Sequence, residues 1–414
     1  MKKPLLILLA TLLSITCSMA QGFWLQLSNA PSGLGRFDDV FFLNENLGWA
    51  ANGPSSQVYK TTDGGETWTL QFDPGGYFRN IEFLNENIGF LGTLSNTFYK
   101  TTDGGDTWTE VSITPNPPAI CGLDTVGEST VYGCGAWFDP AYVIKSTDSG
   151  ETWEFIDMSA YAEALVEVLF IDEQTGFVSG NASSGGVILK TTDGGNSWTP
   201  IFNSGNEGDY VWKLQLLENN TVMFGSIQSN VSGRLAKSLD SGLNWQTFSA
   251  PEGFVQAVGF QTPERGWMGG HNTGFYETND GGETWSSLGL GDNLNRIFWL
   301  NPNLGYASGE SIYKFTGFLS TEEFESVPVP DLDVKVAPTP IKDKLNVEIR
   351  FTHSDNLVIE LYDLTGRFIT KFIREQITDP NTKQYSFDFN YSPGTYLLDV
   401  HTNNHRKGIV ITKE

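Results

Sequence analysis

The hydrophobic residues of this chain recur in short runs that are separated by tight polar turns. In residues 42–49, Phe42-Leu43 is followed by Asn44-Glu45-Asn46 and then by Leu47-Gly48-Trp49. This pattern predicts a strand, a turn and a second strand. Related segments, some of them more degenerate, occur at 83–90, 123–132, 170–177, 216–224, 260–267 and 299–306. These seven units predict an all-β fold.

A second motif follows the strand–turn–strand pattern in the first six units. Its first copy is the run from Tyr59 to Trp68, Tyr-Lys-Thr-Thr-Asp-Gly-Gly-Glu-Thr-Trp. The motif aspartates are spaced 40, 45, 45, 47 and 40 residues apart, and they are Asp63, Asp103, Asp148, Asp193, Asp240 and Asp280. A repeat of this length suits a four-stranded blade.

The seventh unit lacks this motif. Residues 312–316 form the expected strand, but no Asp-Gly-Gly-x-Thr-Trp follows them. Near the other end of the chain, Trp24-Leu25-Gln26 copies the run Trp68-Thr69-Leu70-Gln71. We therefore expect residues 23–28 to supply the outermost strand of blade seven, which would close the ring and remove the exposed edges of an open array.

The chemistry of the repeated motif is structural. In Thr-x-Asp-x-Gly-x-Thr-Trp the carboxylate accepts hydrogen bonds inside the turn, and the glycine takes a positive φ. We expect the tryptophan to pack against the neighbouring blade, where burying ~150–250 Å² contributes up to ~4–6 kcal/mol. The tryptophans in this role are Trp24, Trp68, Trp108, Trp153, Trp198, Trp245 and Trp285.

These motifs resemble the Asp-box, or bacterial neuraminidase repeat, of sialidase-like propellers. With the Gly-Trp hairpin upstream, the pattern is most similar to the seven-bladed propellers of the photosystem II stability and assembly factors. The resemblance implies a seven-bladed β-propeller over residues 21–318. The fifth copy has Leu239, Ser241 and Asn244 in place of Thr, Gly and Thr, from which we expect a looser turn.

The N-terminus has the pattern of a secretory signal peptide. Lys2 and Lys3 precede an apolar run from Leu5 to Leu13, and Ser18-Met19-Ala20 forms a small-x-small cleavage site. We expect residues 1–20 to be removed before Gln21; a lipoprotein anchored through Cys17 is the less favoured alternative. The apolar run is too short to span a bilayer, and we expect no transmembrane segment.

The C-terminal part has a different composition. Residues 331–414 carry 11 basic and 12 acidic residues, whereas residues 21–330 carry 12 and 37. An acidic stretch with prolines predicts a linker at 319–333. In residues 334–414, apolar and polar residues alternate with period two, as at 345–349, which predicts a small β-sandwich.

Three segments of this tail resemble the C-terminal sorting domain of the type IX secretion system. They are Ala337-Pro338-Thr339-Pro340, the run 361–366 (Leu-Tyr-Asp-Leu-Thr-Gly), and 392–398 followed by 407–410. The family usually has Pro-Asn-Pro where this chain has Thr339. The resemblance implies that residues 334–414 engage the type IX translocon and that the protein passes through the periplasm to the outer-membrane surface or the medium. An ordinary binding sandwich is the alternative.

Charge and composition exclude several classes of function. The net charge of −24 argues against nucleic acid or anionic lipid as a partner. Phosphate-loop and dinucleotide motifs are absent, and we expect no cofactor and no metal. Cys121 and Cys134 lie on one predicted hairpin, either as a disulfide or as two small buried residues.

Candidate binding residues gather where the innermost strands of the blades are expected to begin. Arg79, Lys213 and Arg296 align within one residue of each other at this position, with Arg36 just before it. Aromatic and acidic residues fall in the same segments, so that the candidate set is Arg36, Tyr77, Arg79, Trp137, Asp139, Tyr210, Lys213 and Arg296. Such a surface suits a sugar or a peptide, although solvated loops with salt bridges would give the same pattern.

The sequence favours a non-catalytic module that binds a protein or a glycan. No catalytic set is recognisable, and we assign no catalytic residue. The alternative is an extracellular glycoside hydrolase, sialidase-like or glucanase-like, that uses carboxylates on the same face; a retaining enzyme would need two carboxyls ~5–5.5 Å apart. A structural or assembly role with a stable protein partner is a third possibility.

Overall fold

The computed structural model describes residues 22–32, 35–135, 140–217, 220–316, 332–338, 340–351, 355–363, 368–379, 381–402 and 406–414. The predicted signal peptide and residues 319–331 of the predicted linker lie outside them. Every regular element in the described residues is a strand, which confirms the all-β class.

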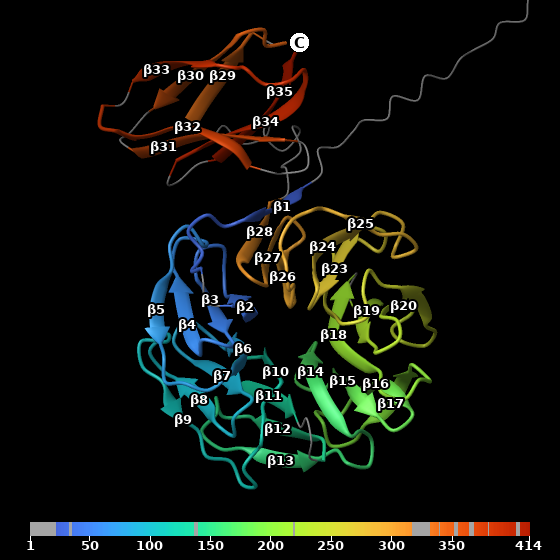
Figure 1. Ribbon diagram of the computed structural model, residues 1–414. Coiled ribbons are helices and arrows are strands. Elements are labelled where there is room, and N and C mark those ends of the chain that lie inside the picture. Colours follow the sequence, from blue (N-terminus) through green and yellow to red (C-terminus); the bar gives the residue numbers. More distant parts are fainter. Residues whose placement is uncertain are drawn as a thin grey trace, which may run out of the picture.

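The described part of residues 22–316 forms seven four-stranded antiparallel sheets, which are arranged as the blades of a propeller (Figure 1). Blades 1 to 3, from the innermost strand outward, are β2 (Phe37–Phe42), β3 (Gly48–Asn52), β4 (Gln57–Thr61) and β5 (Thr69–Phe72); β6 (Phe78–Phe83), β7 (Gly89–Thr93), β8 (Phe98–Thr101) and β9 (Thr109–Glu110); and β10 (Gly122–Val126), β11 (Thr130–Gly135), β12 (Tyr142–Ser146) and β13 (Glu154–Asp157).

Blades 4 to 6 follow in the same order. They are β14 (Ala164–Phe170), β15 (Gly176–Ala182), β16 (Gly185–Thr191) and β17 (Thr199–Asn203); β18 (Tyr210–Leu217), β19 (Val222–Gln228), β20 (Arg234–Ser238) and β21 (Gln246–Ser249); and β22 (Val255–Phe260), β23 (Gly266–Gly270), β24 (Thr273–Thr278) and β25 (Ser286–Ser287).

Blade 7 is built from both ends of the propeller sequence. It contains β26 (Arg296–Asn301), β27 (Leu304–Ser308), β28 (Ile312–Thr316) and, as its outermost strand, β1 (Phe23–Gln26). β1 pairs antiparallel with β28, with Phe23 opposite Thr316. Trp24 of β1 is only 1% exposed and packs against Trp267 and Phe275 of blade 6. The N-terminal strand therefore occupies the place that the sequence predicts for it.

The repeated aspartate forms a closed turn at the end of the third strand of a blade. In blade 1, Asp63 Oδ1 accepts hydrogen bonds from Thr61 Oγ1 (2.8 Å) and the Thr67 N–H (2.9 Å), and Asp63 Oδ2 accepts one from Thr67 Oγ1 (2.6 Å). Gly64 and Gly65 have φ values of 69° and 93°. The same pattern surrounds the aspartates at 103, 148, 193, 240 and 280.

The fifth turn is not looser than the others, contrary to the expectation from its sequence. Asn244 donates its backbone N–H to Asp240 Oδ1 (2.8 Å) and its amide to Oδ2 (2.7 Å), so that it replaces the usual Thr. Ser241 takes a φ of 60° in place of a glycine.

Aromatic rings join neighbouring blades face to face. Trp49 of blade 1 stacks on Phe83 of blade 2 with ring centroids 3.5 Å apart, and Tyr306 of blade 7 stacks on Phe42 of blade 1 at 3.4 Å. A Cβ on Gly48 would lie 2.5 Å from the Phe42 ring, which explains the glycine of the Gly-Trp hairpin. Each motif tryptophan packs on the preceding blade. Trp108 of blade 2, for example, lies in one hydrophobic cluster with Trp49 and Val58 of blade 1.

The repeated lysines also connect blades. Lys145 Nζ lies 5.5 Å from the Tyr132 ring centroid and donates to the Gly194 carbonyl in the aspartate turn of the next blade (2.8 Å). Lys314 does the same with Tyr306 and Gly64 across the closure (3.0 Å).

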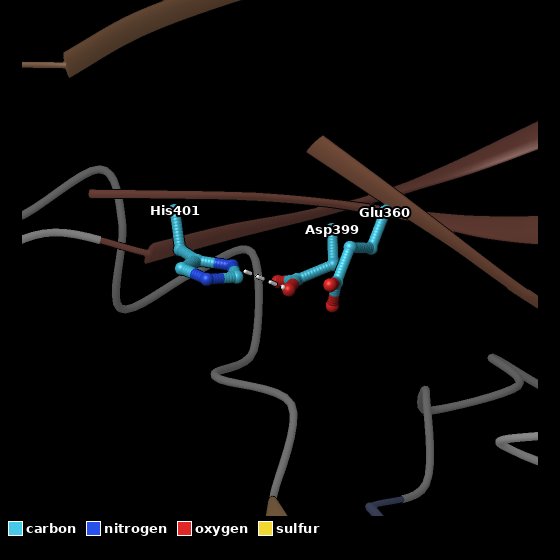
Figure 2. Close-up of side chains that lie close together, drawn as sticks. All are labelled: Glu360, Asp399 and His401. Atoms are coloured by element: carbon cyan, nitrogen blue, oxygen red, sulfur yellow. Dashed lines mark hydrogen bonds and ion pairs between the residues drawn. The ribbon is translucent and has the colours of Figure 1, made fainter. Parts of the chain in front are cut away.

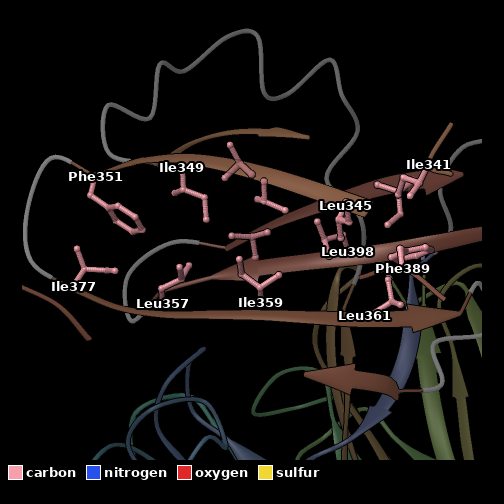
Figure 3. Close-up of a cluster of buried hydrophobic side chains, with 14 residues drawn as sticks. Ile341, Leu345, Ile349, Phe351, Leu357, Ile359, Leu361, Ile377, Phe389 and Leu398 are labelled. Atoms are coloured by element: carbon pink, nitrogen blue, oxygen red, sulfur yellow. The ribbon is translucent and has the colours of Figure 1, made fainter. Parts of the chain in front are cut away.

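The C-terminal residues form a two-layer sandwich. One sheet contains β29 (Leu332–Ala337), β30 (Lys344–Phe351) and β33 (Thr382–Asp388), and the other contains β32 (Phe368–Ile377), β31 (Asp355–Asp363), β34 (Gly394–His401) and β35 (Arg406–Lys413). Leu345 and Ile349 of the first sheet face Ile359, Leu361 and Leu398 of the second (Figure 3). β29 begins within the last two residues of the predicted linker.

Replacing Trp24 by alanine should lower the free energy of unfolding by about 3–5 kcal/mol, because the change opens a cavity between blades 6 and 7. Denaturation in urea, followed by tryptophan fluorescence, measures this effect. The control is Leu243→Ala, at a side chain that is 82% exposed, which should change stability by no more than about 0.5 kcal/mol. Equal losses in the two variants would contradict closure by β1.

The aspartate turns should make the propeller sensitive to acid. Hydrogen bonds from Thr152, Ser197 and Thr284 lower the pKa of Asp148, Asp193 and Asp280 to about 2. Because the folded-state pKa lies below the ordinary value of ~3.9, their stabilisation is present above about pH 4 and is lost as the pH falls toward about 2.

The urea midpoint should therefore fall between about pH 4 and pH 2. Asp280→Asn should lower the midpoint at neutral pH and reduce this acid-induced fall. A midpoint that does not change over this range would show that the turns add nothing to stability.

Candidate functional site

A cavity of about 860 Å³ lies on the upper face, which we define as the face on which the innermost strands begin. Its walls include apolar side chains from blades 2 to 6, such as Leu94, Val166, Trp212 and Phe254. The polar wall is formed mainly by residues at the starts of β2 and β6. The ring geometry explains this site, because it brings seven strand starts around one centre.

Asp38 is the centre of the polar wall. Arg36 Nε lies 2.6 Å from Asp38 Oδ1, and Arg79 Nη1 lies 2.8 Å from Asp38 Oδ2. Arg36 Nη2 also donates to the Tyr77 hydroxyl (3.0 Å). Burial, followed by the charge of Asp38, raises the pKa of Tyr77. Two guanidinium groups thus share one carboxylate, which leaves one excess positive charge in the wall.

His271 extends this wall to blade 6. Its Nδ1 lies 2.9 Å from Arg36 Nη1. Burial, together with the positive charge of Arg36, lowers the pKa of His271. The imidazole is therefore neutral at neutral pH, and Nδ1 accepts a hydrogen bond from Arg36.

Arg79 and Gln228 each bring to the cavity wall a buried polar atom that has no hydrogen-bond partner among the described residues. These atoms are Nη2 of Arg79, whose side chain is 5% exposed, and Oε1 of Gln228. One is a charged donor and the other an acceptor. Leaving such groups unpaired costs about 1–3 kcal/mol each, which a ligand with a matching acceptor and donor would recover.

A second ionic cluster lies deeper between the innermost strands. Glu167 of β14 contacts Lys213 Nζ of β18 (2.6 Å) and Arg296 Nη1 of β26 (2.8 Å), and Arg296 Nε lies 3.5 Å from Asp39. Burial lowers the pKa of Lys213 and raises that of Asp39. This cluster joins blades 1, 4, 5 and 7 across the centre of the ring.

The opposite end of the innermost strands has a smaller cavity of about 460 Å³. Arg296 lines it together with Glu82 and Asp124. Burial raises the pKa of Asp124 to about 7 and raises that of Glu82 well above its ordinary value. These two acids hold protons at pH values at which exposed carboxyls are ionised.

The structure brings most of the predicted binding residues together, in two separate clusters. Arg36, Tyr77 and Arg79 line the upper cavity, and Tyr210 packs against the wall residue Trp212 with ring centroids 6.0 Å apart. Lys213 and Arg296 lie deeper and bind Glu167. Trp137 and Asp139 lie outside the described residues.

Sequence reasoning missed Gln228, Glu82 and Asp124. Gln228 ends a second strand, where the repeat has no polar signature, and Glu82 and Asp124 lie on innermost strands whose inward direction the motif does not reveal.

Cys121 and Cys134 lie buried beside each other on the predicted hairpin. The Cys121 N–H donates to the Cys134 carbonyl (2.7 Å), and burial raises the pKa of the Cys134 thiol. The structure records both side chains as thiols. A disulfide in the exported protein stays a prediction.

Glu167→Gln should lower the free energy of unfolding by about 3–5 kcal/mol, because Lys213 and Arg296 would remain buried without their shared carboxylate. Glu163→Gln, at an exposed residue just before the same strand, is the matched control. Urea unfolding of both variants measures the difference. If the Glu167→Gln variant were as stable as the wild-type protein, the cluster would be hydrated rather than buried.

Comparison with known proteins identifies the tail. Residues 335–412 match the secretion system C-terminal sorting domain. This tail indicates export by the type IX secretion system to the cell surface or outer membrane. None of the described residues forms a helix that could span a bilayer.

Solved structures with the same propeller fold differ widely in function. YCF48 bound to D1 peptide has a TM-score of 0.55 at 18% identity, over 73% of this chain and 98% of that one. PorZ, a surface component of the type IX system of Porphyromonas gingivalis, has a TM-score of 0.56 at 14% identity, over 94% and 61%. The GH74 enzyme of Niastella koreensis has a TM-score of 0.53 at 14% identity, over 94% and 74%.

These identities show the fold alone. None of the curated proteins matches the sequence.

Proposed function

We propose that this protein is a non-catalytic binding propeller, displayed at the cell surface, whose upper cavity takes an extended peptide segment of a partner protein. Residues 1–20 would direct export across the inner membrane, and the sorting domain would engage the type IX translocon. The repeated aspartate turns would act as Asp-boxes in the structural sense, holding the blades rather than contacting the ligand.

The observation that carries the proposal is that two polar atoms without hydrogen-bond partners, Arg79 Nη2 and Gln228 Oε1, lie in a cavity whose other walls are apolar. A peptide backbone offers a carbonyl oxygen for the guanidinium and an N–H for the amide oxygen. Its side chains can pack on Leu94, Val166 and Phe254. Apolar walls with a few placed polar groups are typical of a ligand site.

The walls favour a peptide over a sugar. The guanidinium of Arg79 lies 5.3 Å from the ring centroid of Trp212, and Trp212 is only 3% exposed. A sugar would need an open aromatic face on which to stack, and Trp212 does not offer one; the exposed ring of the wall is Phe254, at 39%. The excess positive charge around Asp38 suits carbonyl or carboxylate oxygens instead.

The comparisons are compatible with this function. YCF48, which has the same fold, was solved with a bound peptide, and PorZ is a surface component of the secretion system that the tail of this chain addresses. Both likenesses support the proposal at the level of architecture.

A glycoside hydrolase is the second candidate. Its support is the acid pair Glu82 and Asp124 beside the lower cavity, where a proton held near neutral pH suits a general acid, and the fold of a GH74 enzyme. On the upper face, the carboxylates of Asp38 and Glu167 are each held by two cations, which argues against the same chemistry there.

Binding to a peptide library and to a glycan array tests the proposal, with the purified mature chain as the probe. We expect selected peptides to bind, and Gln228→Leu to weaken binding roughly 5- to 150-fold, because it removes one hydrogen-bond acceptor worth ~1–3 kcal/mol. Gln246→Leu, at an exposed residue of the same blade, should leave binding unchanged.

Two results would contradict the proposal. The first is binding to glycans but to no peptide. The second is hydrolysis of xyloglucan or aryl glycosides that Asp124→Asn abolishes, which would favour the hydrolase.

A further inference from the structure

Three metal-ligating side chains lie on one face of the four-stranded sheet of the sorting domain. Glu360 on β31 lies directly opposite Asp399 on β34, and His401 follows two residues later on the same face of β34. Figure 2 shows the imidazole and both carboxylates turned toward one another. Their ligand atoms all lie within 4.8 Å of one another.

The two carboxylates place like charges side by side in the sheet. Like charges directly opposite on neighbouring strands destabilise a sheet, and these groups are poorly solvated, with side chains 13% and 5% exposed for Glu360 and Asp399. Lys371 Nζ lies 3.0 Å from Glu360 Oε1 and supplies one charge. His401 Nδ1 lies 2.9 Å from Asp399 Oδ2, but it supplies a charge only when protonated.

We propose that Glu360, Asp399 and His401 bind a divalent first-row metal ion, Zn²⁺ in the first place. One imidazole and two carboxylates are ligands that Zn²⁺ uses, and three protein ligands leave a fourth position for water or a further group. Their mutual separation is close to that of ligands around one ion, so that binding requires small side-chain movements.

The surroundings of the trio fit a metal site. A cavity of about 410 Å³ lies beside Glu360 and His401 and is lined on its other side by β1 residues of the propeller such as Gln26, which leaves room for a water ligand. The Tyr362 hydroxyl donates to Glu360 Oε2 (2.6 Å). Such a partner orients a ligating carboxylate.

Lys371 is the competitor of the metal ion. Its side chain is 39% exposed, so that the ammonium group can leave Glu360 for solvent when an ion arrives. Lys371→Ala should therefore strengthen metal binding. If Lys371 and Glu360 formed only a structural ion pair, this change would remove the pair without strengthening metal binding.

Calorimetric titration of the full mature chain, purified without a histidine tag, tests the proposal with Zn²⁺. Co²⁺ serves as a second probe, because its visible absorption reports the coordination geometry. We expect saturable binding of one ion, weakened roughly tenfold or more by Glu360→Gln and by His401→Ala, and strengthened by Lys371→Ala. Glu348→Gln leaves the trio intact and should bind as the wild type does.

Two outcomes would overturn the site. One is the absence of saturable binding of either ion to the wild-type chain. The other is binding that Glu360→Gln and His401→Ala leave unchanged, which would place the ion elsewhere. Thermal unfolding of each variant without metal shows that the chain is folded, so that a loss of binding reports the ligand set.

Discussion

The antiparallel pairing of β1 with β28 is the contact on which the rest of the propeller depends. It places a strand from the start of the domain in the last blade, so that the ring is closed by hydrogen bonds within a sheet. A propeller without this pairing would expose an unpaired edge and the apolar surface of blade 6. Trp24, which fills that surface, is equivalent to the tryptophans that the other blades carry after their aspartate turns.

Closure lets one set of contacts repeat around the ring. An aromatic ring of one blade stacks on a phenylalanine of the next, a lysine reaches the neighbouring aspartate turn, and a glycine makes room for the stacked ring. Because these contacts are made between blades, the ring holds its shape only when every blade has two neighbours. The aspartate turns then stabilise the ends of strands without any need for a ligand.

The same closure creates the candidate site. Seven innermost strands converge on one axis, and the charged side chains that they carry are withdrawn from water. Most of these charges are paired across blades, as Glu167 is with Lys213 and Arg296. Among the described residues, one guanidinium nitrogen and one amide oxygen at the upper cavity have no hydrogen-bond partner, and two buried acids with raised pKa values lie beside the lower cavity.

Much of the fold could be predicted from the sequence, because period, turn chemistry and aromatic spacing all repeat. Less of the candidate site could be predicted from the sequence. Arg36, Arg79 and Arg296 were found because they align at strand starts, but their sharing of Asp38 and Glu167 depends on contacts between blades that are distant in sequence. The trio Glu360, Asp399 and His401 has no spacing motif, since it forms only when β31 and β34 pair.

Hydrogen exchange of the β1 amides tests ring closure most directly. The account predicts that the β1 amides whose N–H groups face β28 are protected as strongly as those of β28, because both strands open only when the ring opens. Exchange of β1 as fast as that of an unpaired chain terminus, with β28 still protected, would contradict it.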